Sequence, residues 1–153
     1  MRNPLNCDRS TGLGMLLARV PMGVFFICAG YYKWKGGVDS FVSQNSDKLP
    51  TWGPHEWGMH YLQAIPYAEL AVGVLLIVGF LTRLSGLVGA LMVATFTYAV
   101  TGWRTPAGQP FNISFNLIFI GLLLAIFLVG PGRISLDGLL FGKKASPPLP
   151  PAE

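Results

Sequence analysis

Two residues of opposite charge could do chemistry together in this chain. Glu69 lies inside an apolar run, Ala64 to Leu81, where a charge is costly unless a partner compensates it. Lys33 directly follows another apolar run, Leu13 to Tyr31. Helical side chains lean toward the N-terminus of their own helix, so in two antiparallel helices these two side chains lean toward each other. The sequence therefore predicts an ion pair between Lys33 and Glu69.

This pair has two possible roles, and the residues alone leave both open. As a structural pair, it would fix one helix against the next. As part of a polar site, it would join the amide of Asn116, with Tyr67 and Tyr98 nearby, around a carbonyl-bearing ring. Asn116 also has a plainer interpretation, a hydrogen bond between helices that contributes about 1 kcal/mol or less.

A second polar cluster is expected at the other end of the same helices. Arg19 lies in the first half of its apolar run, so its side chain leans away from Lys33 and can extend to the membrane surface. There we expect it beside Arg83 and Arg133, with Asp137 as the counter-charge. One interpretation is contact with lipid headgroups plus a structural bond to the end of the last helix. The other is a site for an anion or a quinone headgroup.

The elements that position these residues are four apolar runs, each near the roughly 17 to 25 residues that cross a bilayer. They are Leu13 to Tyr31, Ala64 to Leu81, Leu84 to Val100 and Ile113 to Val129. Only 12% of the residues are charged and 52% are hydrophobic, whereas a soluble domain carries about 25% charged residues. The predicted fold is an all-α integral membrane four-helix bundle.

Domain organisation follows from these runs. Residues 1–144 form one transmembrane domain, and residues 145–153 form a proline-rich tail that is expected to be extended. In the long segment between the first two runs, Val38, Phe41 and Val42 share one face of a short amphipathic helix. A tight connection at Thr82 and Arg83 joins the second and third runs.

Basic residues predict the orientation, because lysine and arginine near short loops gather on the cytoplasmic side. Six lie on the side that holds both termini and four lie on the opposite side. The six are Arg2, Arg9, Arg83, Arg133, Lys143 and Lys144, and the four are Lys33, Lys35, Lys48 and Arg104. We therefore expect a multi-pass protein of the plasma (inner) membrane with both termini in the cytoplasm.

Other partners and cofactors are constrained by what the sequence lacks. The pI near 9.3 suits anionic lipid, and no segment resembles a nucleic-acid-binding module. Cys7 and Cys28 form no Cys-x-x-Cys motif, haem attachment or zinc spacing, so both are expected to be free thiols. The expectation is no metal and no intrinsic cofactor, with quinone as the one candidate ligand.

Together these residues resemble the DoxX family of small four-helix membrane proteins, in a pattern that covers most of the chain. Its most specific part is the closing segment Gly130-Pro131-Gly132-Arg133-Ile134-Ser135-Leu136-Asp137. The rest of the pattern is Arg19-x3-Gly23, Gly30-x2-Lys33, and Glu69-x3-Gly73-x-Leu75-Leu76 leading into Gly79-Phe80-Leu81-Thr82-Arg83. Related sequences often carry an acidic residue near the start of the fourth helix, where this chain has Asn112 and Asn116.

The resemblance implies two functions of different kinds. The group includes a subunit of membrane thiosulfate:quinone oxidoreductase and other members associated with redox or respiratory assemblies, although most members have no assigned activity. The chain is therefore expected to be an accessory subunit, without catalytic activity alone, that packs against other membrane subunits of a larger redox complex. The alternative is a quinone-linked oxidoreductase subunit with Lys33, Glu69 and Asn116 around the quinone.

Overall fold

The computed structural model describes residues 4–49, 54–101, 115–132 and 134–141, and these contain helices and turns but no strand. The predicted all-α class is therefore confirmed for the described part of the chain. Asn112, Arg133 and the tail at 145–153 lie outside it. The elements are α1 (Pro4–Lys35), α2 (Val38–Asn45), the short 3₁₀ helix η1 (Ser46–Lys48), α3 (His55–Val78), α4 (Thr82–Thr101), α5 (Phe115–Val129) and α6 (Leu136–Phe141).

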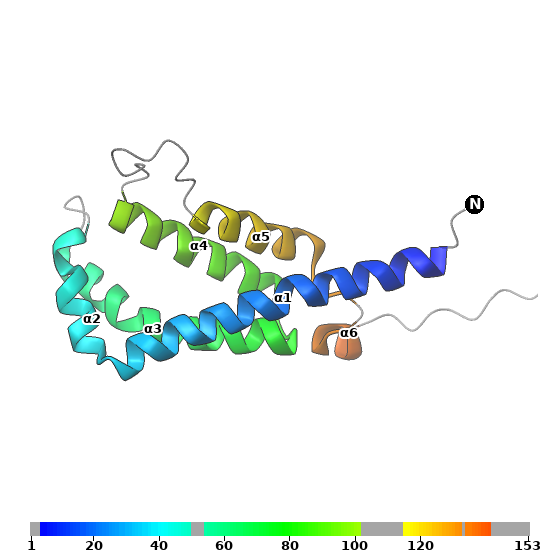
Figure 1. The fold of residues 1–153 in the computed structure, drawn as a ribbon, viewed down its shortest axis with the longest axis horizontal. Coiled ribbons are helices and arrows are strands. Elements are labelled where there is room, and N and C mark those ends of the chain that lie inside the picture. The colour runs from blue at the N-terminus through cyan, green and yellow to red at the C-terminus, as the bar shows by residue number, and fades with distance from the viewer. Residues whose placement is uncertain (1–3, 50–53, 102–114, 133, 142–153) are drawn as a thin grey trace, which may run out of the picture.

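Four long helices lie side by side, with a short helix at each end of the molecule (Figure 1). α1 packs along α3 and α4 packs along α5, and contacts of α3 with α4 and of α1 with α5 join the two pairs. α2 lies at one end, whereas α6 lies at the end where α1 begins (Figure 1). We refer to these as the α2 end and the α6 end.

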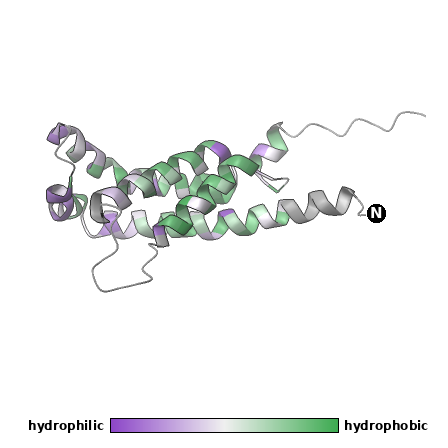
Figure 2. Ribbon diagram, turned by 90° about the horizontal axis from the view of Figure 1, so that it is seen from above, coloured by the Kyte–Doolittle hydropathy of each residue, from purple (hydrophilic) through white to green (hydrophobic). Residues whose placement is uncertain are grey.

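Within the described residues, two helices are long and apolar enough to cross a membrane, Gly12–Lys35 within α1 and the whole of α3. The apolar stretch Asn116–Val129 in α5 is shorter. Hydrophobic residues run along the length of the long helices, whereas hydrophilic residues gather toward the α2 end (Figure 2). Many large apolar side chains face outward, including Leu17, Leu91 and Leu128, at 65%, 57% and 71% exposure. Such a surface suits lipid better than water.

The helix boundaries differ from the apolar runs. α3 begins at His55, whereas its apolar run begins at Ala64, because the helix continues through polar and aromatic residues that hydropathy does not detect. It ends at Val78, where Gly79 adopts a left-handed conformation (φ 73°) and closes the helix with its N–H on the Leu75 carbonyl. The predicted connection at Thr82 and Arg83 is wrong, since both residues lie in the first turn of α4.

Glycines bring the backbones of α1 and α3 into direct contact. A Cβ added to Gly23 would lie 2.7 Å from the carbonyl oxygen of Gly73, and a Cβ added to Gly73 would lie 2.7 Å from that of Gly23. At Gly30, an added Cβ would lie 2.7 Å from the Pro66 carbonyl oxygen and 3.1 Å from the Cβ of Glu69. The spacing of these glycines therefore holds α1 close to the helix that carries Glu69.

The core fills the space between the helix pairs. Phe26 of α1, Leu76 of α3 and Leu123 of α5 are buried within one cluster. A separate cluster anchors α2, whose Val42 packs on α3, so the predicted short amphipathic helix is present and covers the end of the bundle.

Candidate functional site

The ammonium of Lys33 donates a hydrogen bond to Oε1 of Glu69. The structure therefore contains the ion pair that the directions of the two side chains predict. Lys33 lies in the last turn of α1, and Glu69 lies near the middle of α3. Both side chains are largely covered by protein, with 20% exposure for Lys33 and 12% for Glu69. The second carboxylate oxygen, Oε2, is buried and has no hydrogen-bond partner within the described residues.

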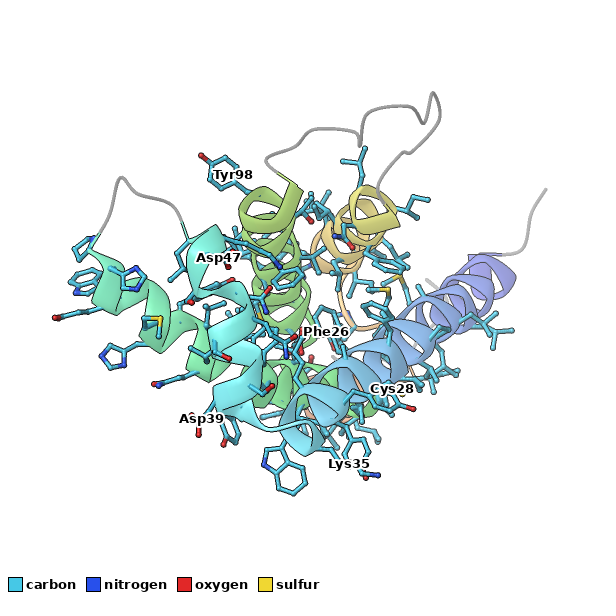
Figure 3. The ribbon with its side chains drawn as sticks, turned by 60° about the vertical axis from the view of Figure 1, so that its left-hand side comes forward. Phe26, Cys28, Lys35, Asp39, Asp47 and Tyr98 are labelled. Atoms are coloured by element: carbon cyan, nitrogen blue, oxygen red, sulfur yellow. The ribbon has the colours of Figure 1, made fainter. Side chains whose placement is uncertain are left out.

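The pair lines a cavity of about 110 Å³ between the four long helices. The other polar residue in its wall is Asn116 of α5, and its aromatic walls are Phe25 and Phe26 of α1 and Phe96 of α4. Phe26 extends from α1 toward the other helices, whereas the neighbouring Cys28 points away from them (Figure 3). The cavity is therefore an apolar chamber with three polar side chains in its wall.

Asn116 makes no hydrogen bond with the described residues, so its amide is available to the cavity. The interhelical hydrogen bond that was the plainer interpretation of Asn116 is not seen among these residues. Tyr67 and Tyr98 do not join the site, because they are 55% and 45% exposed and lie outside the cavity wall. For Tyr67 the reason is helical periodicity, since a residue two positions from Glu69 lies on a different face of α3.

At the α6 end, Arg19 is buried with 1% exposure. Its guanidinium donates to the carbonyl oxygens of Pro131, at 2.9 Å, and Ile134, at 2.6 Å, and to the hydroxyl of Thr82 at 3.4 Å. A Cβ on Gly79 would lie 2.3 Å from Nη1 of Arg19, so only a glycine at position 79 leaves room for the Arg19 side chain. The predicted extension of Arg19 to lipid headgroups is wrong, because the side chain is buried and its terminal nitrogens bind acceptors inside the protein, whereas its Nε has no partner among the described residues.

Asp137 and Arg19 lie close enough for their charges to act on each other, but the carboxylate of Asp137 makes its hydrogen bonds to the main chain. Its carboxylate accepts from the backbone N–H groups of Leu81 (2.9 Å) and Thr82 (2.8 Å), which the start of α4 leaves without helical partners. Partial burial opposes its ionisation, but these hydrogen bonds and the charge of Arg19 outweigh burial, and the pKa of Asp137 lies below its ordinary value. We call Arg19, residues 79–82 and the described residues of 131–137 the clasp.

The other members of the predicted cluster do not surround Arg19. Arg83 is exposed and lies beside Gly130, and Arg133 lies outside the described residues. An open hollow of about 620 Å³ beside the clasp is lined in part by Arg83 and Asp137, but Arg19 does not line it. The geometry of Arg19 is therefore that of a structural contact and not of an anion or quinone site.

Sequence reasoning missed the aromatic walls and most of the clasp. Phe25, Phe26 and Phe96 are ordinary apolar residues in apolar helices, so no local signal marks them. Ser135 could have been recognised, because a serine three residues before Gly138 fits a helix cap: its hydroxyl accepts from the Gly138 N–H at 2.9 Å. In the described ranges, no group of three or more His, Cys, Asp or Glu residues is placed to hold a metal ion.

A family model, DoxX, matches residues 14–102, more than half of the chain. The chain belongs to the DoxX family. The matched segment of this DoxX protein contains Arg19, Lys33 and Glu69, whereas Asn116 and Asp137 lie beyond it. The matched range therefore spans both residues of the ion pair and Arg19 of the clasp.

Two relatives extend the DoxX similarity over almost the whole chain. The Bacillus subtilis (strain 168) protein named "Putative oxidoreductase CatD" is 30% identical over 138 residues, which cover 90% of this chain and 95% of that protein. An uncharacterized protein from Haemophilus influenzae (strain ATCC 51907 / DSM 11121 / KW20 / Rd) is 28% identical over 145 residues, covering 90% and 88%. No solved structure matches.

Proposed function

We propose that this DoxX protein is a quinone-binding subunit of a membrane redox assembly, with the quinone ring held beside Lys33, Glu69 and Asn116. The observation that carries this proposal is the cavity, which gathers an ion pair, an amide and aromatic rings from all four long helices. Polar groups inside a membrane protein are costly and generally mark functional sites. A pair that served only to join α1 to α3 would need no chamber beside it.

The cavity wall fits such a ligand in size and chemistry. Its volume of about 110 Å³ is of the same order as the roughly 150 Å³ of an apolar cavity that holds benzene. The phenylalanines offer faces and edges for a flat ring. The ammonium of Lys33 and the amide of Asn116, both in the cavity wall, provide polar contacts for substituents at the ring edge.

A bound quinone would accept two electrons and two protons. The chain's own contribution is to bind and orient the ring. Lys33 fixes the position of the Glu69 carboxylate, Asn116 can donate to a carbonyl or accept from a hydroxyl, and the phenylalanines exclude water. Glu69 is also the group on this wall that can accept a proton from a ring hydroxyl.

A partner is expected to supply the electrons. The oxidoreductase name of the similar Bacillus subtilis protein and the resemblance to a thiosulfate:quinone oxidoreductase subunit support a redox context. We expect co-purification with larger membrane subunits after extraction in a mild detergent. A protein that ran only as a free monomer or homo-oligomer would contradict this part of the proposal.

The membrane arrangement is also proposed. All four long helices would cross the plasma membrane, with the α2 end outside and both termini in the cytoplasm. The apolar outer surface and the distribution of basic residues support it. A reporter enzyme fused after Glu153 should be active only when the reporter is one that functions in the cytoplasm. Activity of a periplasm-dependent reporter at that position would overturn the orientation.

The binding site itself is tested by filling the cavity. Ala29→Leu adds bulk to the cavity wall, whereas the matched control, Cys28→Leu, adds bulk on the exposed side of the same turn of α1. Titration of the purified proteins with decyl-benzoquinone, followed by quenching of tryptophan fluorescence, should show binding to the wild type and to Cys28→Leu. Ala29→Leu should lose it. Equal binding by all three proteins would place any quinone site elsewhere.

An accessory role is the second candidate, because the Lys33–Glu69 pair does join α1 to α3. It is favoured if the wild type binds no quinone but still co-purifies with its partners. In that case Ala29→Leu should leave the assembly unchanged.

A further inference from the structure

The cavity beside Lys33 is not enclosed but partly open to the outside. Of the four long helices around it, α1 packs along α3 and α5 packs along α4, whereas contacts between α1 and α5 are few. α1 and α5 also separate toward the α2 end, which is the half of the bundle that contains Lys33 and Asn116 (Figure 1). The sparsely packed side of the cavity is therefore the one between α1 and α5, and in the proposed membrane arrangement this side faces lipid.

The residues at the edges of this side follow from the directions of the two helices. Phe25 of α1 contacts Phe119 of α5, with 4.6 Å between the ring centroids. The helices are antiparallel (Figure 1), so one turn onward from Phe25 and one turn back from Phe119 reach the same level. These positions are Ala29 and Asn116, both partly exposed and both in the cavity wall. We call the space between Ala29 and Asn116 the lateral opening.

Phe25 separates the cavity from the outer surface. It lines the cavity and is still 42% exposed. The adjacent Phe26 is buried and packs on α4, where a Cβ added to Gly89 would lie 3.3 Å from its ring. The rings of Phe25 and Phe119 thus close this side of the cavity toward the α6 end. At the lateral opening itself the α1 side chain is only the methyl group of Ala29, so the wall is thin there.

The α2 end offers no comparable way out. Phe41 and Val42 of α2 pack in one cluster with Ile65 and Phe96, and the last two residues line the cavity. The ammonium of Lys33 lies 5.4 Å from the ring centroid of Phe41 and so lies under the same cover. α2 therefore covers the cavity on the side of the membrane surface, and the lateral opening remains as the route to the outside.

The size of the cavity limits what it can hold. Its volume of about 110 Å³ accommodates one ring, by comparison with the roughly 150 Å³ of a cavity that binds benzene. No room remains for a long alkyl or isoprenoid chain. A chain attached to the ring therefore has to leave the cavity, and beside the lateral opening it meets apolar side chains, Phe25 and Phe119 below it and the exposed Leu117 on the outer surface of α5.

We propose that the ligand of this cavity is a long-tailed molecule dissolved in the bilayer, whose ring enters between α1 and α5 and whose apolar tail stays in the lateral opening. The inference rests on the proposed quinone site and specifies the class of quinone, one with a lipid tail, and the route by which it arrives. The ring reaches Lys33 and Asn116, while the tail lies against Phe25 and Phe119.

The first test locates the tail on the wild-type protein. The probe is a decyl-benzoquinone with a photoreactive diazirine in the first half of its tail, bound to the purified full-length protein in phospholipid nanodiscs. Irradiation and peptide mass spectrometry should place the label on α1 around Phe25 and on α5 around Phe119. An excess of unlabelled decyl-benzoquinone should remove this label, which distinguishes it from labelling of the general lipid-facing surface.

The second test separates the tail from the ring. Phe119→Leu alters a residue that contacts Phe25 but does not line the cavity. It should weaken binding of decyl-benzoquinone several-fold and leave binding of a tailless methyl-benzoquinone unchanged, both followed by quenching of tryptophan fluorescence. The matched control is Phe127→Leu, a partly buried phenylalanine farther along α5 toward the α6 end, which should bind both probes as the wild type does.

The outcomes separate this inference from the proposal beneath it. Competed label on α2 or at the start of α3 would show that the tail leaves at the α2 end, and it would overturn the lateral route while leaving the quinone site intact. An equal loss of both probes in Phe119→Leu, or no loss of either, also contradicts the lateral route. Binding of neither probe by the wild type removes the proposed function and this inference together. Should Phe119→Leu fail to fold, the photolabelling of the wild type decides alone.

Discussion

Arg19 and Lys33, two cations of α1 that the protein covers, are held by different kinds of acceptor. Arg19, at the α6 end, donates to the main-chain carbonyls of Pro131 and Ile134. Lys33, at the α2 end, donates to a side-chain carboxylate and lies against two aromatic rings. The acceptors of Arg19 belong to a turn that is itself closed by Ser135 and Asp137, whereas the acceptor of Lys33 lines a cavity.

The difference separates architecture from a site. A carbonyl in a closed turn cannot move away from its cation unless the turn unfolds. The clasp is therefore either folded or unfolded, with no state in which Arg19 is released. The Lys33–Glu69 pair, in contrast, lines a cavity that a ligand could occupy. A charge that protein covers therefore suggests function when it borders a space that can be filled.

The largest expected effect is at the clasp. Arg19→Met keeps most of the side-chain length but removes the hydrogen bonds of a charged donor to two main-chain carbonyls and to the hydroxyl of Thr82. Each such bond contributes roughly 1.5 to 3 kcal/mol, so the free energy of unfolding should fall by about 4 kcal/mol or more. Unfolding by SDS in mixed micelles measures it.

The control for the clasp is Arg83→Met. Arg83 is exposed at the start of α4, and its removal should change stability by less than about 0.5 kcal/mol. A similar loss in both variants would show that Arg19 has no special structural role, and the contrast with Lys33 would disappear.

The second prediction concerns rescue, which only the Lys33 end allows. Lys33→Met leaves the Glu69 carboxylate buried without its cation and should destabilise the protein by about 3 kcal/mol. The double variant Lys33→Met with Glu69→Gln removes both charges and should recover most of that loss. The same unfolding assay on the two single variants and the double variant gives the coupling energy.

Additive losses would mean that Lys33 and Glu69 act independently, and the ion pair would not explain the close contact of α1 and α3. No equivalent rescue exists for Arg19→Met, since its acceptors are main-chain carbonyls that no substitution removes. Replacing the cation and its acceptor together should therefore restore stability at the α2 end but not at the α6 end.

The sequence predicts the positions of the charges better than their partners. Helical periodicity and side-chain direction were enough to bring Lys33 toward Glu69, because both residues lie on long regular helices. The same reasoning named Asp137 as the counter-charge of Arg19, and the two charges do act on each other, but each side chain makes hydrogen bonds to backbone groups that the reasoning did not predict. Residue types do not reveal where the main chain of a turn leaves carbonyl or N–H groups open.

The cavity illustrates a second limit. Asn116 was identifiable as a polar residue in an apolar helix, but Phe25, Phe26 and Phe96 become a wall only when the four long helices assemble. The small residues show the same dependence on packing. Gly86 of α4 packs tightly on α5, with an added Cβ 2.9 Å from the Leu123 carbonyl oxygen, whereas Gly121 of α5 has nothing within 4 Å. Equivalent spacing in a sequence does not distinguish the face that packs from the face that is exposed.

The smallest expected effect is at Asp137, and it depends on pH. Its folded-state pKa lies below the ordinary value, so the stabilisation that it provides is present above the ordinary aspartate pKa and is lost as the pH falls through the lower, folded-state pKa.

Asp137→Asn keeps an acceptor but removes the charge at the start of α4 and should cost about 1 kcal/mol at neutral pH. At a pH below both pKa values the wild type and the variant should be equally stable, whereas Asp39→Asn, on the exposed face of α2, should match the wild type at every pH. Unfolding measured across the acidic range gives the comparison. A difference between wild type and Asp137→Asn that stayed constant with pH would mean that Asp137 acts through its shape and not its charge, and the clasp would then rest on Arg19 as its one essential charge.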